Sequence, residues 1–132
     1  MKALKNKVIK SSKGSIVKYL STKSKFFKRF GEIYFNEINH KKKKGWILHK
    51  KNVCLFICVF GKVKFHIIDK RKKEKFFILP ATTGKILKIL PNNWFSLESL
   101  KGKSIIANIL EYPHQDNEVQ KSDIIKNYKI KN

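Results

Sequence analysis

The fold is decided by residues 31–38, GEIYFNEI, and by residues 44–49, KGWILH, which follow after a basic loop. Both segments are short and rich in β-branched or aromatic residues, as strands are. Runs of this kind recur at about 32–39, 46–49, 53–60, 62–68, 75–79, 85–90, 94–100 and 103–110, and turns rich in Gly, Pro, Asn, Asp or Lys separate them. No segment sustains a 3.6-residue period. The pattern therefore predicts an all-β sandwich or barrel.

Length and composition indicate one globular domain. The chain has 132 residues, of which 42% are hydrophobic, enough for a core. We divide it into a basic N-terminal segment (1–30) with a strand that could be swapped, a barrel (31–112) and a C-terminal tail (113–132). The stretch 122–132 is expected to form a helical turn or a frayed tail.

The formal net charge is +22, and 29 of the 31 basic residues are lysine. Arginine is preferred for bidentate recognition of phosphate and bases, so a lysine-rich surface makes nucleic acid an unlikely partner. The chain also has 17 Ile and 10 Asn, and Lys, Ile and Asn are what an AT-rich genome encodes. Two explanations stay open: genome composition acting on a solvated surface, or a polyanionic partner. A lysine-rich nucleic-acid-binding barrel is the weakest of the functional hypotheses.

The apolar runs and cysteines favour the cytoplasm. The longest apolar run, residues 53–60, is far shorter than the roughly 18 residues of a membrane span. The basic N-terminus has no apolar core of a secretory signal. Cys54 and Cys58 would lie about 13 Å apart on one face of a strand, too far for a disulfide. We expect two buried thiols in a reducing compartment.

Several motifs, taken in order and spacing, resemble one known family. They are GEIYFNEI (31–38), KGWxxH (44–49), the strand ending at residue 61 with KVKF after it, IDKR (68–71), LP followed by WF (90–95), and EYPH with NE (111–118). Over about residues 30–123 the chain resembles the dTDP-4-dehydrorhamnose 3,5-epimerase family. It is most similar to a short, single-barrel branch related to the sugar-nucleotide 3,4-ketoisomerases.

The resemblance implies a cupin-like jelly-roll barrel that forms a homodimer by exchanging or pairing N-terminal strands. Such a contact would also cover open sheet edges. It implies a nucleotide-linked 4-keto-6-deoxyhexose as substrate, deoxysugar and cell-surface polysaccharide biosynthesis as the context, and no metal or other cofactor. The chain lacks the clustered histidines of metal-binding cupins, which agrees with that implication.

In that family a histidine acts as base, a lysine stabilises the enolate and a tyrosine acts as acid. The base position aligns with Ile47, the lysine position with Cys54, and the tyrosine position falls near Ala107 or Asn108. Two hypotheses follow. The protein is an isomerase or epimerase in which His49, on the same strand face as Ile47, takes over as base. Alternatively it is a non-catalytic cupin module that binds a sugar or another small molecule.

The enzyme hypothesis assigns six site residues. His49 is the catalytic base or a substrate contact, Lys44 contacts the diphosphate, and Arg71 holds phosphate or a carboxylate such as Asp69. The pocket would be lined by Trp46, Trp94 and Asn108.

Each assignment has a structural alternative. His49 could be a rim residue at a strand end, the tryptophans could be core residues at the barrel mouth, and Asn108 could be a satisfied core amide. His66 shares a strand face with Lys62 and Lys64, so we expect it on the exterior. His114 is expected to pair with Asp116 or Glu118.

Overall fold

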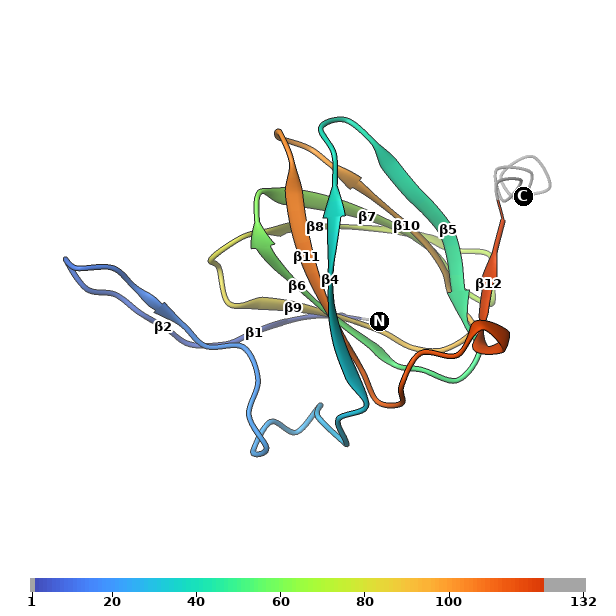
Figure 1. The fold of residues 1–132 in the computed structure, drawn as a ribbon, viewed down its shortest axis with the longest axis horizontal. Helices are drawn as coiled ribbons and strands as arrows, with labels where there is room; N and C mark the ends of the chain where they lie inside the picture. The colour runs from blue at the N-terminus through green and yellow to red at the C-terminus, as the bar shows by residue number, and fades with distance from the viewer. Residues whose placement is uncertain (1, 123–132) are drawn as a thin grey trace.

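The computed structural model describes residues 2–122. They form twelve strands and one short 3-10 helix (Figure 1). In chain order these are β1 (Lys2–Lys5), β2 (Val8–Ile9), β3 (Ile16–Val17), β4 (Glu32–Ile38), β5 (Lys43–His49), β6 (Cys54–Phe60), β7 (Lys62–Ile68), β8 (Glu74–Pro80), β9 (Lys85–Ile89), β10 (Trp94–Ser99), β11 (Ser104–Leu110), η1 (Asp116–Glu118) and β12 (Val119–Lys121).

Ten of the strands build two five-stranded antiparallel sheets. Sheet A has the order β1-β9-β6-β11-β4 and sheet C the order β12-β5-β10-β7-β8. The sheets face each other, and Figure 1 shows β4 and β5 joined by a short connection at the top of the view and diverging below it. The all-β class is confirmed. The two sheets are separate ladders, so the jelly roll is an open, flattened form of the predicted barrel.

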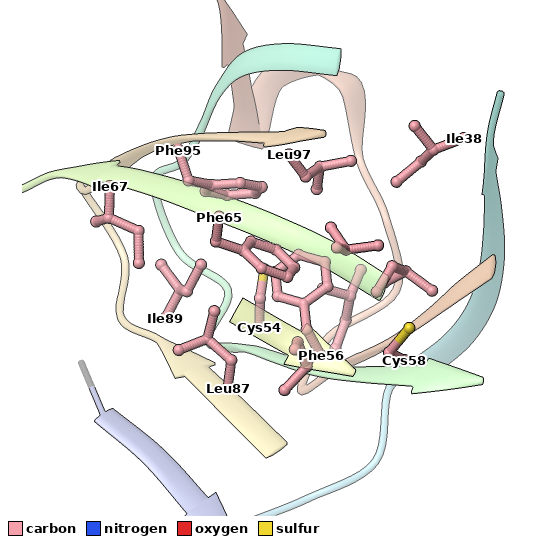
Figure 2. Packing of buried hydrophobic residues seen from close by; sticks show 14 residues of the cluster. Ile38, Cys54, Phe56, Cys58, Phe65, Ile67, Leu87, Ile89, Phe95 and Leu97 are labelled. Carbon is pink, nitrogen blue, oxygen red and sulfur yellow. The ribbon is translucent and has the colours of Figure 1, made fainter. Parts of the chain in front are cut away.

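The core lies between the sheets because strand side chains alternate between two faces. On β7, Val63, Phe65 and Ile67 point inward and are fully buried. Phe56 from sheet A meets Phe65 and Phe95 from sheet C with ring centroids 4.9 and 5.4 Å apart (Figure 2). These aromatic contacts join the two sheets at the centre of the molecule.

All eight predicted core strands are present, with ends shifted by one residue in most cases. The largest shift is in β5, which begins at Lys43 rather than at residue 46. The structure adds strands that the sequence did not predict: β1, β2 and β12. These are short and lysine-rich or lie outside the periodic region, so their pattern gave little signal.

Both ends of the described chain join the sheets. β1 pairs with β9 of the same chain, and the short hairpin β2–β3 projects away from the body (Figure 1). β12 pairs with β5. Residues 119–121, which the sequence analysis assigned to the C-terminal tail, therefore extend sheet C. The rest of that segment, 123–132, lies outside the described residues, as does most of the expected helical turn or frayed tail.

The two cysteines are free and buried in the core, as expected. Burial raises the pKa of the Cys54 thiol to about 12 and that of Cys58 to about 11. Residues 2–122 contain no helix with the length and apolar character needed to cross a membrane. Within the same range no three His, Cys, Asp or Glu side chains gather as a metal site would require.

Candidate active site

A pocket of about 850 Å³ opens where the edge strand β4 faces β5 and β12. This volume is in the range of small-molecule sites. The pocket is lined by Glu32, Tyr34 and Asn36 of β4, by Lys44, Gly45, Trp46, Ile47 and His49 of β5, and by His114, Val119, Lys121 and Ser122.

Gly45 shapes the pocket wall. Its φ of +117° lies in a region that favours glycine. A Cβ at this position would lie 2.8 Å from the carbonyl oxygen of Phe95, so only glycine lets β5 approach β10 this closely. The ladder between these strands has a β-bulge at Trp46, because Phe95 pairs with Ile47 and Ser96 with Gly45. A bulge re-aims the side chains beyond it, which here are those of Ile47 and His49.

His49 lies at the end of β5 and forms a buried pair with Glu118. Its Nδ1 is 2.9 Å from Oε2 of Glu118, and the His49 residue is only 4% exposed. A carboxylate only accepts hydrogen bonds, so Nδ1 carries the proton. In the neutral imidazole Nε2 is then the unprotonated nitrogen, which is the form of a general base. Val119 pairs with His49 across the β5–β12 ladder, which places Glu118 beside the ring.

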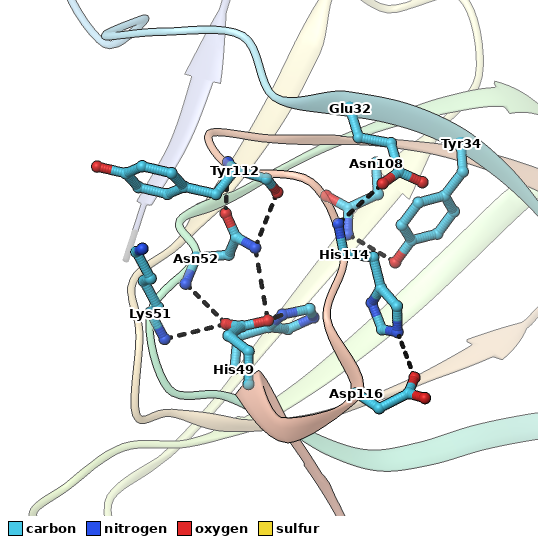
Figure 3. A network of polar contacts seen from close by, with 10 residues as sticks. Glu32, Tyr34, His49, Lys51, Asn52, Asn108, Tyr112, His114 and Asp116 are labelled. Carbon is cyan, nitrogen blue, oxygen red and sulfur yellow. Dashed lines mark hydrogen bonds and ion pairs between the residues drawn. The ribbon is translucent and has the colours of Figure 1, made fainter.

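The carboxylate of Glu118 is held in place by the chain that follows β5. Its Oε1 accepts hydrogen bonds from the backbone N–H of Asn52 at 2.7 Å and of Lys51 at 3.0 Å (Figure 3). Burial acts to raise the pKa of Glu118, but these two backbone N–H groups and His49 together hold it below its ordinary value. The group therefore stays ionised at neutral pH and keeps the imidazole in one orientation.

Asn52 ties this arrangement to β11. Its amide Nδ2 donates to the Tyr112 carbonyl at 3.1 Å, and its Oδ1 accepts from the Tyr112 N–H at 2.8 Å (Figure 3). Asn52 is fully buried, so these bonds are shielded from water. The turn after β5, the end of β11 and η1 are thereby fixed to one another around His49.

Tyr34 contributes a second proton-bearing group. The Asn108 Nδ2 donates to the Tyr34 hydroxyl at 2.9 Å, which leaves the tyrosine's own proton available to a ligand. Burial raises the pKa of Tyr34, and the hydrogen bond from Asn108 offsets this only in part. Tyr34 is thus a neutral hydrogen-bond donor on the β4 wall of the pocket.

Lysines give one part of the pocket positive charge. The Lys44 ammonium donates to Asn36 Oδ1 at 2.5 Å, and Lys121 lines the wall contributed by β12. The His114 side chain also lines the pocket, with its Nε2 3.3 Å from Asp116, as the sequence predicted. Its backbone N–H donates to Glu32 at 2.8 Å, which fastens the segment after β11 to the start of β4.

The structure gathers three of the six predicted site residues. Lys44, Trp46 and His49 line the pocket, although the Trp46 ring packs against Ile68 and Trp94 on the outer face of sheet C. Trp94 itself is part of that outer cluster.

The other two predicted residues lie outside the pocket lining. Asn108 is fully buried behind Tyr34, as the core alternative expects, but only its Nδ2 is hydrogen-bonded; its Oδ1 has no partner among the described residues, so the amide is not fully satisfied. Arg71 lies in the turn between β7 and β8, where its backbone N–H donates to Asp69 Oδ1 at 2.8 Å. Asp69 also accepts from the Lys73 N–H, so it shapes this turn rather than the pocket.

Sequence reasoning missed Tyr34 and Glu118. Alternation within GEIYFNEI puts Tyr34 on the same strand face as Glu32 and Asn36. The sequence alone could therefore have predicted that these three side chains point the same way. The register pairs Tyr34 with Asn108, the position where the tyrosine of the family was sought. Glu118 carried no such signal, because its role depends on β12.

The expectation that His66 is exterior is wrong in one respect. It does point to the outer face of sheet C, but it is only 7% exposed. Trp46 and Phe76 cover its ring, with centroids at 4.8 and 4.3 Å. Its Nε2 is 2.7 Å from Glu74.

A family model described as FdtA: WxcM-like, C-terminal matches residues 1–130 of the chain. The chain belongs to the FdtA family. This confirms the relationship read from the sequence motifs. A search of curated protein sequences gave no match.

Solved structures share the fold of this FdtA-family chain. A dTDP sugar isomerase from Desulfovibrio desulfuricans superposes with a TM-score of 0.88 at 22% identity, over 96% of this chain and 86% of the other. A mutant of the 3,4-ketoisomerase QdtA from Thermoanaerobacterium thermosaccharolyticum, in complex with TDP-4-keto-6-deoxyglucose, superposes with a TM-score of 0.81 at 18% identity. The match covers 98% of this chain and 91% of the other. A dTDP-4-dehydrorhamnose 3,5-epimerase from Bacillus anthracis, with TDP and PPi bound, superposes with a TM-score of 0.82 at 14% identity. The match covers 90% of this chain and 76% of the other.

Proposed function

We propose that this protein is a sugar-nucleotide isomerase or epimerase that acts on a nucleoside-diphosphate 4-keto-6-deoxyhexose. His49 is its general base and Tyr34 its hydrogen-bond donor. The observation that carries the proposal is the buried His49–Glu118 pair at the wall of a pocket that also holds Tyr34 and Lys44. The proposed context is cytoplasmic deoxysugar biosynthesis for cell-surface polysaccharide, without a cofactor.

The pocket supplies the groups that this chemistry needs. A base must remove the proton from the carbon beside the 4-keto group, while the electrons of that C–H bond form a carbon–carbon double bond to C4 and the π electrons of the carbonyl move onto the keto oxygen. A neutral imidazole whose other nitrogen is bonded to a carboxylate suits the first task. The neutral Tyr34 hydroxyl suits the second, because it donates a hydrogen bond to the oxygen as negative charge develops.

Return of the proton decides the product. Delivery to C4, with a proton gained by the C4 oxygen and the proton of the C3 hydroxyl lost, moves the keto group from C4 to C3. Delivery to the opposite face of C3 inverts that centre. A single histidine on one wall favours return to the face from which the proton was taken, and so favours the ketoisomerase.

The substrate class is supported by the charges and by the solved relatives. Lys44 and Lys121 lie on the pocket wall, where their ammonium groups suit a diphosphate. One structure with the same fold holds TDP-4-keto-6-deoxyglucose and another holds TDP and PPi. The family resemblance also implies a homodimer, which we include in the proposal.

A non-catalytic binding module is the second candidate. Ile47 stands on the pocket wall where the resemblance places the base, and the Cys54 and Asn108 positions are buried in the core. This candidate keeps the pocket and the nucleotide sugar but has no turnover.

The test is to incubate the protein with dTDP-4-keto-6-deoxyglucose in deuterated water and to follow the C3, C4 and C5 signals by NMR. We expect loss of the C3 proton and growth of deuterium at C4, and no exchange in His49→Asn. The matched control is His66→Asn, which removes the other buried histidine.

Binding of dTDP without any exchange in the wild type would leave the binding module as the function. Exchange at C5 as well as at C3 would make the protein a 3,5-epimerase. Exchange that survives in His49→Asn would overturn the assignment of the base.

A further inference from the structure

The β7–β8 hairpin is strongly basic, and its charge has no part in the pocket. Residues 62–80 contain seven lysine or arginine residues and two acidic residues. Four of the seven are consecutive, KRKK at 70–73, and all four are exposed in the turn between the two strands. Among the described residues, those that line the pocket include none from this hairpin. The IDKR motif at 68–71 therefore has no role in the proposed reaction.

The two carboxylates of the hairpin have partners within it. Asp69 Oδ1 accepts hydrogen bonds from the backbone N–H groups of Arg71 at 2.8 Å and of Lys73 at 2.9 Å. Glu74 Oε1 lies 2.7 Å from Nε2 of His66 on the neighbouring strand. These contacts fix the turn and the His66 ring. Seven cations and two carboxylates leave the hairpin with a formal charge of +5.

Two large apolar side chains are exposed on the outer face of the same hairpin. Phe76 is 53% and Ile78 51% exposed, and both lie on β8, an edge strand of sheet C. They follow Glu74, at the end of the turn, by about 7 and 13 Å along the strand. Lys64 of β7 pairs with Ile78 across the ladder, and its ammonium lies 4.9 Å from the centre of the Phe76 ring. Cations and exposed apolar side chains thus share one surface.

This combination matches the chemistry of an anionic lipid surface. Clustered lysines are attracted to the phosphates of anionic headgroups, and apolar side chains beside them can enter the boundary between headgroups and acyl chains. Cations alone would suit any polyanion, but an exposed isoleucine next to an exposed phenylalanine gains free energy only where apolar surface leaves water.

A nucleic acid fits the hairpin less well. Single strands are bound by stacking bases on aromatic faces, and arginine is preferred for bidentate contacts to phosphate. The Phe76 ring is already stacked on His66, with centroids 4.3 Å apart, and has the Lys64 ammonium over it. Ile78 offers no surface for stacking, and Arg71 is the single arginine of residues 62–80.

We propose that the β7–β8 hairpin binds the protein peripherally to an anionic lipid surface. The cations at 70–73 contact the headgroup phosphates, and Phe76 and Ile78 enter the boundary region. The pocket stays accessible in this arrangement, because β12 and β5 form one side of sheet C and β7 and β8 the other. The proposal also locates a partner for part of the lysine-rich surface, and it does not depend on catalysis.

The first test is co-sedimentation of the full chain with vesicles of phosphatidylcholine, with and without phosphatidylglycerol. We expect binding to the anionic vesicles alone. Replacing residues 70–73 by glutamine should lower the partition coefficient by about tenfold or more. The matched control removes the same charge from four exposed lysines of the N-terminal segment and should change it by less than about threefold. These are Lys10, Lys13, Lys23 and Lys25.

The second test asks whether the apolar side chains insert. Cys54 and Cys58 are each only 1% exposed, so a thiol added by Ile78→Cys can be labelled selectively with an environment-sensitive fluorophore. We expect its emission to shift to the blue on anionic vesicles. Ile16→Cys is the matched control, because Ile16 is 59% exposed on β3. Its label should show no shift.

Three results would overturn the proposal. Equal losses of binding in the two glutamine variants would mean that the vesicles respond to net charge alone. A label at position 78 that stays in water on bound protein would exclude insertion. Tighter binding to a single-stranded oligonucleotide than to anionic vesicles, at equal phosphate concentration, would assign the surface to nucleic acid. If the variant at 70–73 loses its β-sheet circular dichroism, Lys70→Gln with Arg71→Gln takes its place, with a loss of about threefold or more expected.

Discussion

His49 and His66 are two buried histidines on sheet C, each paired with a glutamate. Their nitrogen-to-oxygen distances are 2.9 Å to Glu118 and 2.7 Å to Glu74. They are 4% and 7% exposed. By burial and pairing alone the two would be equal candidates for a catalytic base.

The surroundings separate them. His49 borders a pocket with Tyr34 and Lys44 on its walls, and the Glu118 carboxylate is fixed by two backbone N–H groups. His66 lies between the rings of Trp46 and Phe76 on the outer face of the sheet. A histidine–carboxylate pair is therefore a candidate for chemistry only where a substrate can reach it, and elsewhere it packs and stabilises.

The largest expected difference is in turnover. His49→Asn should lower the rate by about 10²- to 10⁴-fold, because it removes the general base. His66→Asn should leave the rate within about threefold and lower the free energy of unfolding by about 1–3 kcal/mol, the range for a lost buried hydrogen bond. Single-turnover rates and urea unfolding of both variants measure this. Equal losses of rate in the two would break the comparison.

Glu118→Gln should have the next largest effect, because the amide no longer holds His49 in one tautomer. We expect a rate loss of about 10²-fold or more. The pKa of Glu118 is lower in the folded protein than in the unfolded chain. Its stabilisation is thus fully present above the unfolded pKa and is lost as the pH falls through the folded value.

Urea unfolding as a function of pH checks the predicted pH dependence of the stabilisation by Glu118. The wild type should lose stability below about pH 4.3, the ordinary glutamate value, and Glu118→Gln should lose less over the same range. An identical pH dependence in both proteins would contradict the role given to this carboxylate.

Tyr34→Phe sharpens the comparison, because the pocket that His49 lines also contains the Tyr34 hydroxyl. We expect a rate loss of about 10²-fold, the scale for one donor to a developing oxyanion. The free energy of unfolding should fall by about 1–3 kcal/mol, because the fully buried Asn108 Nδ2 loses its acceptor. Steady-state kinetics with thermal unfolding as the control would show both, and an unchanged rate would remove Tyr34 from the mechanism.

The smallest expected effect concerns charge. Lys44→Met should weaken dTDP binding by about tenfold, or roughly 1.4 kcal/mol. The matched variant Lys64→Met removes a lysine that lies over the Phe76 ring on the outer face. It should leave the affinity unchanged at equal ionic strength. Isothermal titration measures both constants, and equal weakening would mean that dTDP responds to net charge alone.

The sequence predicted the fold better than the site. Alternation along β7 and the turns between strands located the core strands, because those signals are local. The pocket depends on contacts across the chain. Glu118 reaches His49 only because β12 pairs with β5, and three-residue strands leave almost no periodic signal.

Side-chain direction also limited the prediction. The rings of Trp46 and Trp94 were expected at a pocket and lie on the outer face, where Ile68 joins them. The bulge at Trp46 changes which face the following residues take, and no pattern in KGWILH marks it. His66 was placed on the correct face, but cover by Phe76 from the next strand was not foreseen.

The most direct test is an NMR titration of protein labelled with ¹⁵N in its histidines, with dTDP as ligand. We predict that Nδ1 of His49 is protonated, and that dTDP shifts the His49 ring signals while those of His66 stay fixed. A His66 ring that shifts while His49 does not would contradict the account. So would a His49 whose proton lies on Nε2.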